Sequence, residues 1–210
     1  MNVYFDTEFT NLGKDADLIS IGMITENSDV FYAEITDYDR NKCSEFVKST
    51  VLPNLYFGTR NRVDNLHAYR LYDMVPGICS GTKVEVRDKI TDWLSKYNNI
   101  QLVSDCCHFD MVQFIDLYGD ASNLPKGVAP VCHDINGDIA KNYNISDIEA
   151  FDKSREEIYK ELESTKLPSN IPLEMYSKAF FNLGAVAKHN ALYDAIIIAR
   201  ISDYLGIRSN

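Results

Sequence analysis

The sequence predicts an α/β fold in which a mixed β-sheet is flanked by helices. Three strand-like segments come first and are separated by short stretches, and helix-like and strand-like segments alternate later in the chain. Strands followed by such an alternation are typical of a mixed sheet with helices packed against its faces. The chain has 210 residues, 45% hydrophobic and 25% charged, which is enough for one domain with a buried core.

The first three strands are expected at residues 2–6, 18–25 and 30–35, because these segments are rich in β-branched and aromatic residues. A turn-like segment at 26–29 joins the second strand to the third. Short connections of this kind predict an antiparallel meander.

Helical spacing and turn residues place the later elements. Residues 41–51 are expected to be helical and to end before Pro53, and residues 54–81 to form a long loop with short helical pieces. The helix at 154–164 is highly charged and is expected to face solvent. The other expected elements are helices at 84–97, 109–118, from 134, and 191–205, and strands at 100–104 and 128–132.

The formal net charge is −10, with a pI near 4.8. Phosphate contacts by Lys and Arg supply most of the affinity of ordinary nucleic-acid-binding proteins, so this charge counts against that class. An acidic pocket that holds divalent cations reverses the local field and attracts phosphate. If the substrate is nucleic acid, the charge therefore predicts a metal requirement and weak non-specific binding.

Several other classes of protein do not fit the sequence. No apolar run approaches the roughly 20 residues that cross a bilayer, and the charged N-terminal segment does not resemble a signal peptide. Five cysteines without CxxC spacing argue against a disulfide framework and against a zinc site. Cys106 and Cys107 lack a base arrangement for thiol chemistry and are interpreted as structural. We expect a cytoplasmic protein with reduced thiols.

Three acidic segments could supply a catalytic site. Asp6 and Glu8 stand two residues apart at the end of the first strand, so both carboxylates are expected on one face of the sheet. Two like charges so close are costly unless a cation lies between them. Taken alone, the pair fits two solvent-facing acids at a strand end equally well.

The second segment, residues 104–110, leads from a strand into a helix, and Asp110 is expected in the first helical turn. The third segment, residues 188–195, contains His189 and Asp194 around Asn190, which is a good N-cap residue. His189 would then precede the helix and fold back toward Asp194. A helix-start acid and a loop histidine without catalytic duty are the alternative interpretations of these two segments.

In combination, FDTEFT, HFDMVQF and HNALYDA, in that order, resemble the motifs of the DEDD exonuclease superfamily. The histidine five residues before the last aspartate is similar to the DEDDh branch. The opening YFDTEFT followed by LISIG looks closest to small bacterial and phage 3′–5′ exoribonuclease-like proteins. The resemblance runs over roughly residues 3–200, although residues 40–98 and 143–178 match only in length and type of element.

The resemblance implies a single exonuclease domain over residues 1–210, with an RNase H-like fold built on a five-stranded mixed sheet. It implies release of nucleoside 5′-monophosphates from the 3′ end of a nucleic acid, RNA rather than DNA, with two Mg²⁺ or Mn²⁺ ions. His189 would be the general base, and the four metal-associated carboxylates would be those of Asp6, Glu8, Asp110 and Asp194. Because members of the family are often dimers, we also expect a homodimer.

Two departures from the family pattern concern the site. Asp105-Cys106 stands where the second motif usually carries His-Asn, so Asp105 competes with Asp110 for the metal-associated position. After the first motif, Thr-Gly is replaced by Phe9, Thr10, Asn11 and Leu12, which we expect to bind substrate. Phe9 would stack on the terminal base, although a core position suits it equally well. Arg60, Arg62 and Lys188 are candidates for phosphate contacts.

Three alternative functions stay open at the level of sequence. A DNA-directed, proofreading-type exonuclease would carry the same motifs, since preference for RNA depends on contacts to the 2′-hydroxyl that no motif identifies. A small-nucleotide phosphodiesterase would suit the acidic charge. A non-catalytic nucleic-acid-binding module on the same fold is disfavoured because all five catalytic-type residues are present.

Overall fold

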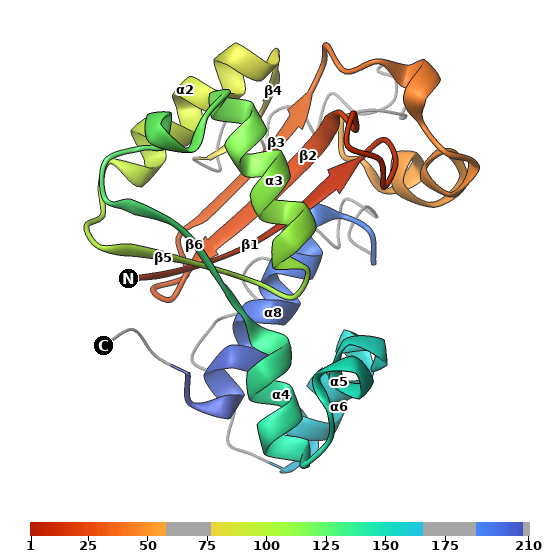
Figure 1. The fold of residues 1–210 in the computed structure, drawn as a ribbon, viewed down its shortest axis with the longest axis vertical. Helices are drawn as coiled ribbons and strands as arrows, with labels where there is room; N and C mark the ends of the chain where they lie inside the picture. Colours follow the sequence, from red (N-terminus) through yellow and green to blue (C-terminus); the bar gives the residue numbers. More distant parts are fainter. Residues whose placement is uncertain (58–76, 166–187, 208–210) are drawn as a thin grey trace, which may run out of the picture.

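The computed structural model describes residues 1–57, 77–165 and 188–207, and these form a mixed six-stranded sheet with helices on both faces (Figure 1). The strand order is β4-β3-β2-β1-β5-β6. The strands are β1 (Asn2–Phe9), β2 (Leu18–Thr25), β3 (Val30–Ile35), β4 (Ile78–Gly81), β5 (Ile100–Ser104) and β6 (Val128–Asp134).

The predicted meander of the first three strands is confirmed, because β1 pairs with β2 and β2 with β3, both antiparallel. The pairs β1–β5, β5–β6 and β3–β4 are parallel. The prediction of five strands is wrong by one: β4 lies in the segment predicted to be a loop. This short edge strand has no alternating pattern of its own, and it forms by adding to the free edge of β3, where the Tyr32 N–H donates to the Gly77 carbonyl.

Helices cover both faces of the sheet. In Figure 1, α3 (Cys107–Tyr118) and α2 (Lys83–Leu94) lie on the near face, and α8 (Ala191–Leu205) crosses behind β1 and β2. Phe5 and Ile90 belong to the hydrophobic cluster on the first side, and Tyr4 and Ile197 to the cluster under α8. Because both faces are covered, every residue of β2 is buried. None of the helices described has the length and apolar character that crossing a membrane requires.

Three helices form a group beside α8, beyond the end of β6 (Figure 1): α4 (Ile135–Tyr143), α5 (Asp147–Asp152) and α6 (Arg155–Thr165). We call this group the α4–α6 lobe. The prediction that the charged helix faces solvent is wrong for one of its faces, because Ile158 and Leu162 are buried in the cluster under α8. Two apolar residues four apart are enough to give a helix a buried side.

The helix predicted at 41–51 is broken into short pieces: η1 (Arg40–Lys42), η2 (Val47–Val51) and η3 (Leu52–Asn54). η2 is a wide π-type turn, and η3 continues past the predicted end at Pro53. A proline is tolerated in the first turn of a helix, because its missing N–H would have had no partner there. η2 forms one wall of the cavity described below.

Candidate active site

The end of β1 carries two carboxylates on the same side of the sheet. Asp6 and Glu8 alternate with Thr7 and share the direction of Tyr4, which lies in the cluster under α8. The register against β2 shifts between Glu8 and Phe9, which marks an irregularity where the chain leaves the strand. Asp6 and Glu8 therefore point toward the N-terminal end of α8, on one face as the alternation predicted.

Asp110 fills the space where β1 and β5 separate. The two strands pair only over Asn2–Tyr4 of β1, so Thr7 has no partner on β5. Oδ1 of Asp110 instead accepts from the Thr7 N–H at 3.0 Å and from the Thr7 hydroxyl at 2.6 Å, and Oδ2 accepts from the Ser104 hydroxyl. Asp110 is 1% exposed. Burial raises its pKa to about 7, although the hydrogen bonds from Ser104 and Thr7 act in the opposite direction.

The start of α8 holds His189 and Asp194 in the predicted arrangement. Asn190 is the N-cap, and its side-chain oxygen accepts from the N–H groups of Leu192 and Tyr193. His189 lies outside the helix with a φ of 68°, and its N–H donates to Oδ2 of Asp194 at 2.9 Å. Since a residue in the left-handed region reverses the chain direction, His189 and Asp194 lie together although they are five residues apart.

Gly22 allows α8 to approach the sheet beside Asp6. Gly22 is the residue of β2 that pairs with Asp6. A Cβ atom at this position would lie 2.3 Å from both the carbonyl carbon of Ala191 and the nitrogen of Leu192. A side chain there would separate the first turn of α8 from the sheet, and with it Asp194 from Asp6. This glycine is part of the segment LISIGMIT, but no local sequence pattern predicted its close contact with the start of α8.

The candidate ligand atoms form two groups. Group 1 contains Asp6, Asp105 and Asp110, and group 2 contains Glu8, His189 and Asp194; within each, one ligand atom per residue lies within 4.8 Å of the others. Burial, followed by repulsion from neighbouring carboxylates, raises the pKa of Asp6 and Glu8 well above the usual range. Burial also raises the pKa of Asp194 to about 8. These carboxylates concentrate negative charge that a divalent cation would neutralise.

His189 is half-buried at the edge of group 2. Its ring meets the ring of Phe46 edge-on, with centroids 5.2 Å apart and planes at 90°. Burial, and then the positive charge of Lys188, lower the pKa of His189 below its usual value. The imidazole is therefore neutral near pH 7 and able to accept a proton.

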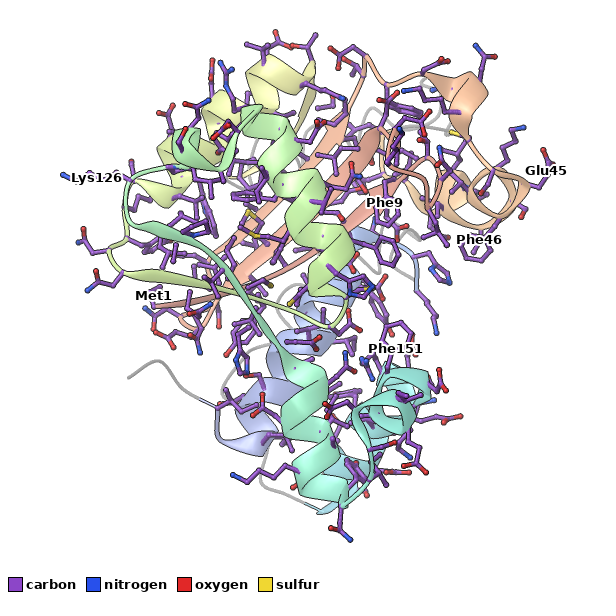
Figure 2. All side chains as sticks on the ribbon, viewed as in Figure 1. Met1, Phe9, Glu45, Phe46, Lys126 and Phe151 are labelled. Carbon is purple, nitrogen blue, oxygen red and sulfur yellow. The ribbon has the colours of Figure 1, made fainter. Side chains whose placement is uncertain are left out.

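Both groups open into a cavity of about 730 Å³ between β1, η2 and the α4–α6 lobe. Phe9 and Phe46 lie on its sheet side and Phe151 on the side of α5 (Figure 2). The other lining residues are Asp6, Thr7, Glu8, Asn11, Leu12, Ser44, Val47, Val51, Asp105, Cys106, Asp110, Asp152, Lys153, Ser154, Arg155, Glu156, Lys188, His189 and Asp194. The volume lies within the usual range for small-ligand sites.

The predicted substrate-binding residues have different positions. Phe9, Asn11 and Leu12 line the cavity, and Leu12 is 74% exposed. The ring of Phe9 stacks on that of Phe109, with centroids 5.9 Å apart. Thr10 departs from the prediction: it is completely buried, and its hydroxyl accepts from the Asp17 N–H, which leaves its side chain unavailable to a ligand. Lys188 lines the cavity, whereas Arg60 and Arg62 lie outside the described residues.

Arg155 is a site residue that the sequence did not reveal. Its Nε donates to Oδ2 of Asp105 at 2.7 Å, while its Nη1 donates to the carbonyl oxygens of Ala150 and Lys153. Asp105 and Asp110, which competed for one position, both belong to group 1, and Arg155 balances the charge of Asp105. The partners are 50 residues apart and Arg155 begins a helix that was expected to face solvent, so no spacing could have paired them.

Comparison with known proteins identifies the fold. No protein-family model matches the chain. Over 55 residues, 26% of the chain, it is 38% identical to the 3′-5′ exoribonuclease Rv2179c of Mycobacterium tuberculosis, and a 3′-5′ exoribonuclease of a second strain of this species matches equally well. The matched segment spans 33% of the length of each relative.

Solved structures match nearly the whole chain. A 3′-exonuclease that recognises the 3′ end of a histone mRNA stem-loop aligns with 96% of this chain and 61% of its own, at 15% identity and a TM-score of 0.58. The nuclease domain of 3′hExo, a DEDDh family member bound to rAMP, aligns with 96% of this chain and 88% of its own, at 16% identity and a TM-score of 0.56. The chain therefore has the fold of the DEDDh 3′-exonucleases, which confirms the predicted RNase H-like α/β class and the predicted resemblance.

Proposed function

We propose that this chain is a divalent-metal-dependent 3′–5′ exoribonuclease that releases nucleoside 5′-monophosphates from the 3′ end of RNA. The observation that carries this proposal is the convergence of two groups of carboxylates, one beside a half-buried histidine, in a single cavity. The DEDDh exonuclease fold and the similarity of one segment to 3′-5′ exoribonucleases support it.

The donor atoms suit Mg²⁺ or Mn²⁺. Both groups are dominated by carboxylate oxygens, which hard cations prefer, and neither contains a cysteine. We infer that Asp6 and Asp110, with Asp105 beside them, would hold one cation, and that Glu8 and Asp194 would hold a second. Bound cations would neutralise the carboxylates and stabilise the charge that develops on the phosphate during hydrolysis.

The residues of the chain would prepare the attacking water. His189 is neutral near pH 7 because its pKa is lowered, so it would accept the proton as the water attacks phosphorus. The N–H of His189 binds Asp194, and the ring of Phe46 supports the imidazole from the side, so backbone and packing both orient the base. The bond to the leaving 3′-oxygen breaks and this oxygen takes up a proton from solvent, which yields a 5′-monophosphate and a strand shortened by one nucleotide that ends in a 3′-hydroxyl.

The cavity walls offer surfaces for bases and phosphates. Phe46 and Phe151 are 55% and 48% exposed, on opposite walls. Base–aromatic stacking contributes about 1–3 kcal/mol per base and tolerates every sequence. Lys153 and Lys188 bring positive charge to the same cavity. A single-stranded 3′ end would enter between these walls, with its scissile phosphate at the two groups.

Degradation of 5′-labelled, single-stranded RNA and of the matching DNA, with Mg²⁺, Mn²⁺ or EDTA, tests the proposal. We expect a ladder that shortens from the 3′ end, stops with EDTA, and is lost in Asp6→Asn. Asp92→Asn, which removes an exposed carboxylate on α2, is the matched control and should keep full activity. Faster cleavage of RNA than of DNA is expected, and the reverse would favour the proofreading-type alternative.

The remaining alternatives give different results in the same assay. Cleavage restricted to dinucleotides in a series of substrate lengths would identify a small-nucleotide phosphodiesterase. Binding of RNA by the folded, metal-supplemented protein without any cleavage would identify a non-catalytic module and overturn the proposal. The expected homodimer stays a prediction, which light scattering of the purified protein tests independently.

A further inference from the structure

Two cysteines outside the catalytic groups lie in direct contact. Cys107 is the first residue of α3 and Cys132 lies on β6. Their sulfur atoms are 2.6 Å apart, and the Cys107 thiol is also 3.1 Å from the carbonyl oxygen of His133. Both residues are partly exposed. Neither residue lines the cavity.

The fold itself brings the two thiols together. β5 and β6 pair in parallel with Leu102 opposite Cys132 and Val103 opposite His133. The chain leaves β5 after Ser104 and starts α3 at Cys107, so the first turn of the helix returns over the neighbouring strand. The contact thus follows from the strand pairing and from the short connection between β5 and α3.

We propose that Cys107 and Cys132 are a site of reversible disulfide formation. With a disulfide such as oxidised glutathione as the oxidant, one protein thiolate attacks it and releases one glutathione thiolate. The second protein thiolate then attacks the mixed disulfide and releases the other glutathione. Two protein thiols lose two electrons and two protons in total, and one oxidised glutathione becomes two reduced molecules.

The bond would fasten the helix that carries Asp110 to the edge of the sheet. It closes a loop from Cys107 to Cys132 that includes all of α3 and the connection to β6. Closing a loop of this length restricts the unfolded chain, so the oxidised protein should unfold at a higher temperature, by roughly 5–10 °C. This inference does not depend on the proposed nuclease function.

The other cysteines provide controls. Cys79 lies on β4 at the opposite edge of the sheet, and Cys43 is buried. Cys106 is adjacent in sequence but lines the cavity. Cys107→Ser and Cys132→Ser remove the proposed bond, whereas Cys79→Ser and Cys106→Ser keep both partners.

Peptide mapping of the full chain after incubation with oxidised glutathione tests the site. Trypsin cuts after Lys96, Lys126 and Lys141, which places the two cysteines in separate peptides, 97–126 and 127–141. We expect these peptides to be joined under non-reducing conditions in the wild type, Cys79→Ser and Cys106→Ser, but not in Cys107→Ser or Cys132→Ser. Reduction should separate the peptides and reverse the increase in melting temperature.

Either of two results would overturn the proposal. The first is a joined pair that survives in Cys107→Ser, which would assign the bond to Cys106. The second is a wild-type protein in which both thiols stay open to alkylation after treatment. Melting curves of the reduced variants establish that each one folds, so a missing cross-link cannot be attributed to unfolding.

Discussion

Groups 1 and 2 use similar side chains but are held in different ways. In group 1, Asp110 is buried and fixed by Thr7 and Ser104, and Arg155 contacts Asp105. In group 2, Asp194 accepts a hydrogen bond from the N–H of His189, a residue in the left-handed conformation outside α8. In group 1, Asp110 is therefore held by residues of strands β1 and β5. In group 2, the positions of His189 and Asp194 depend on how the start of α8 packs on β2.

This difference indicates separate roles for the buried carboxylates and for His189. Buried, hydrogen-bonded carboxylates change position little, which suits residues that hold a cation in place. A partly exposed histidine beside a helix start can adjust to a water molecule and a phosphate, which suits a proton acceptor. Asp110→Asn in group 1 should therefore remove activity and change stability, whereas His189→Asn in group 2 should act mainly on the chemical step.

Among the variants that distinguish the two groups, Asp110→Asn should have the largest effect. Asparagine keeps the size and one acceptor of the side chain but removes a charge from group 1. We expect the rate of nucleotide release to fall by about a thousandfold or more, because charge stabilisation by a bound cation contributes several kcal/mol. The measurement is single-turnover cleavage at saturating Mn²⁺. If Asp110→Asn keeps activity within tenfold of the wild type, Asp105 and not Asp110 is the metal-associated carboxylate of the second motif.

In the metal-free protein, Asp110→Asn should also change how the free energy of unfolding depends on pH. The pKa of Asp110 is raised to about 7 in the folded state, against about 3.9 in an unfolded chain. Its stabilising contribution is therefore fully present below about pH 4 and is lost as the pH rises toward 7. We expect metal-free wild type to lose stability over this range and Asp110→Asn to lose less, as measured by urea unfolding. An equal dependence of stability on pH in the two proteins would contradict the raised pKa of Asp110.

His189→Asn should have the next largest effect. Asparagine tolerates the left-handed conformation that His189 adopts, so the backbone contact with Asp194 should persist. Loss of a general base should lower the rate by about 10²–10⁴-fold with little change in stability. His108→Asn, the same change at an exposed position on α3, is the control. A large loss of Mn²⁺ affinity, measured by calorimetry, would instead indicate that His189 is a metal ligand.

Gly22→Ala tests whether group 2 depends on the docking of α8. The added Cβ atom would meet Ala191 and Leu192 at 2.3 Å, so the start of the helix must move away from the sheet. We expect a loss of about 1–3 kcal/mol in stability and a rate lower by about 10–100-fold, because small misplacements of catalytic groups are costly. Gly137→Ala, on α4 with nothing within 4 Å of the new atom, should be neutral or stabilising.

Local sequence patterns predicted the placement of Asp6 and Glu8 and of His189 and Asp194 better than they predicted the walls of the cavity. Strand alternation placed Asp6 and Glu8 on one face, and the N-cap at Asn190 brought His189 to Asp194. Both follow from rules that act over a few residues. Local patterns gave no indication of β4, which pairs along the edge of β3, or of the salt bridge between Arg155 and Asp105. These depend on contacts between segments far apart in the chain.

The smallest effect on activity is expected from Arg155→Met, which removes the contact with Asp105. Arg155 also binds the carbonyl oxygens of Ala150 and Lys153, so its loss combines an ionic effect with a local effect on the α4–α6 lobe. A double-mutant cycle that combines Arg155→Met with Asp105→Asn separates the ionic effect from the local effect. We expect a coupling free energy of about 1–3 kcal/mol in the unfolding of the metal-free protein, because both side chains are largely buried. The activity of either variant should fall only several-fold. A coupling free energy near zero would mean that Arg155 stabilises only the α4–α6 lobe, and that group 1 does not need the positive charge of Arg155 beside Asp105.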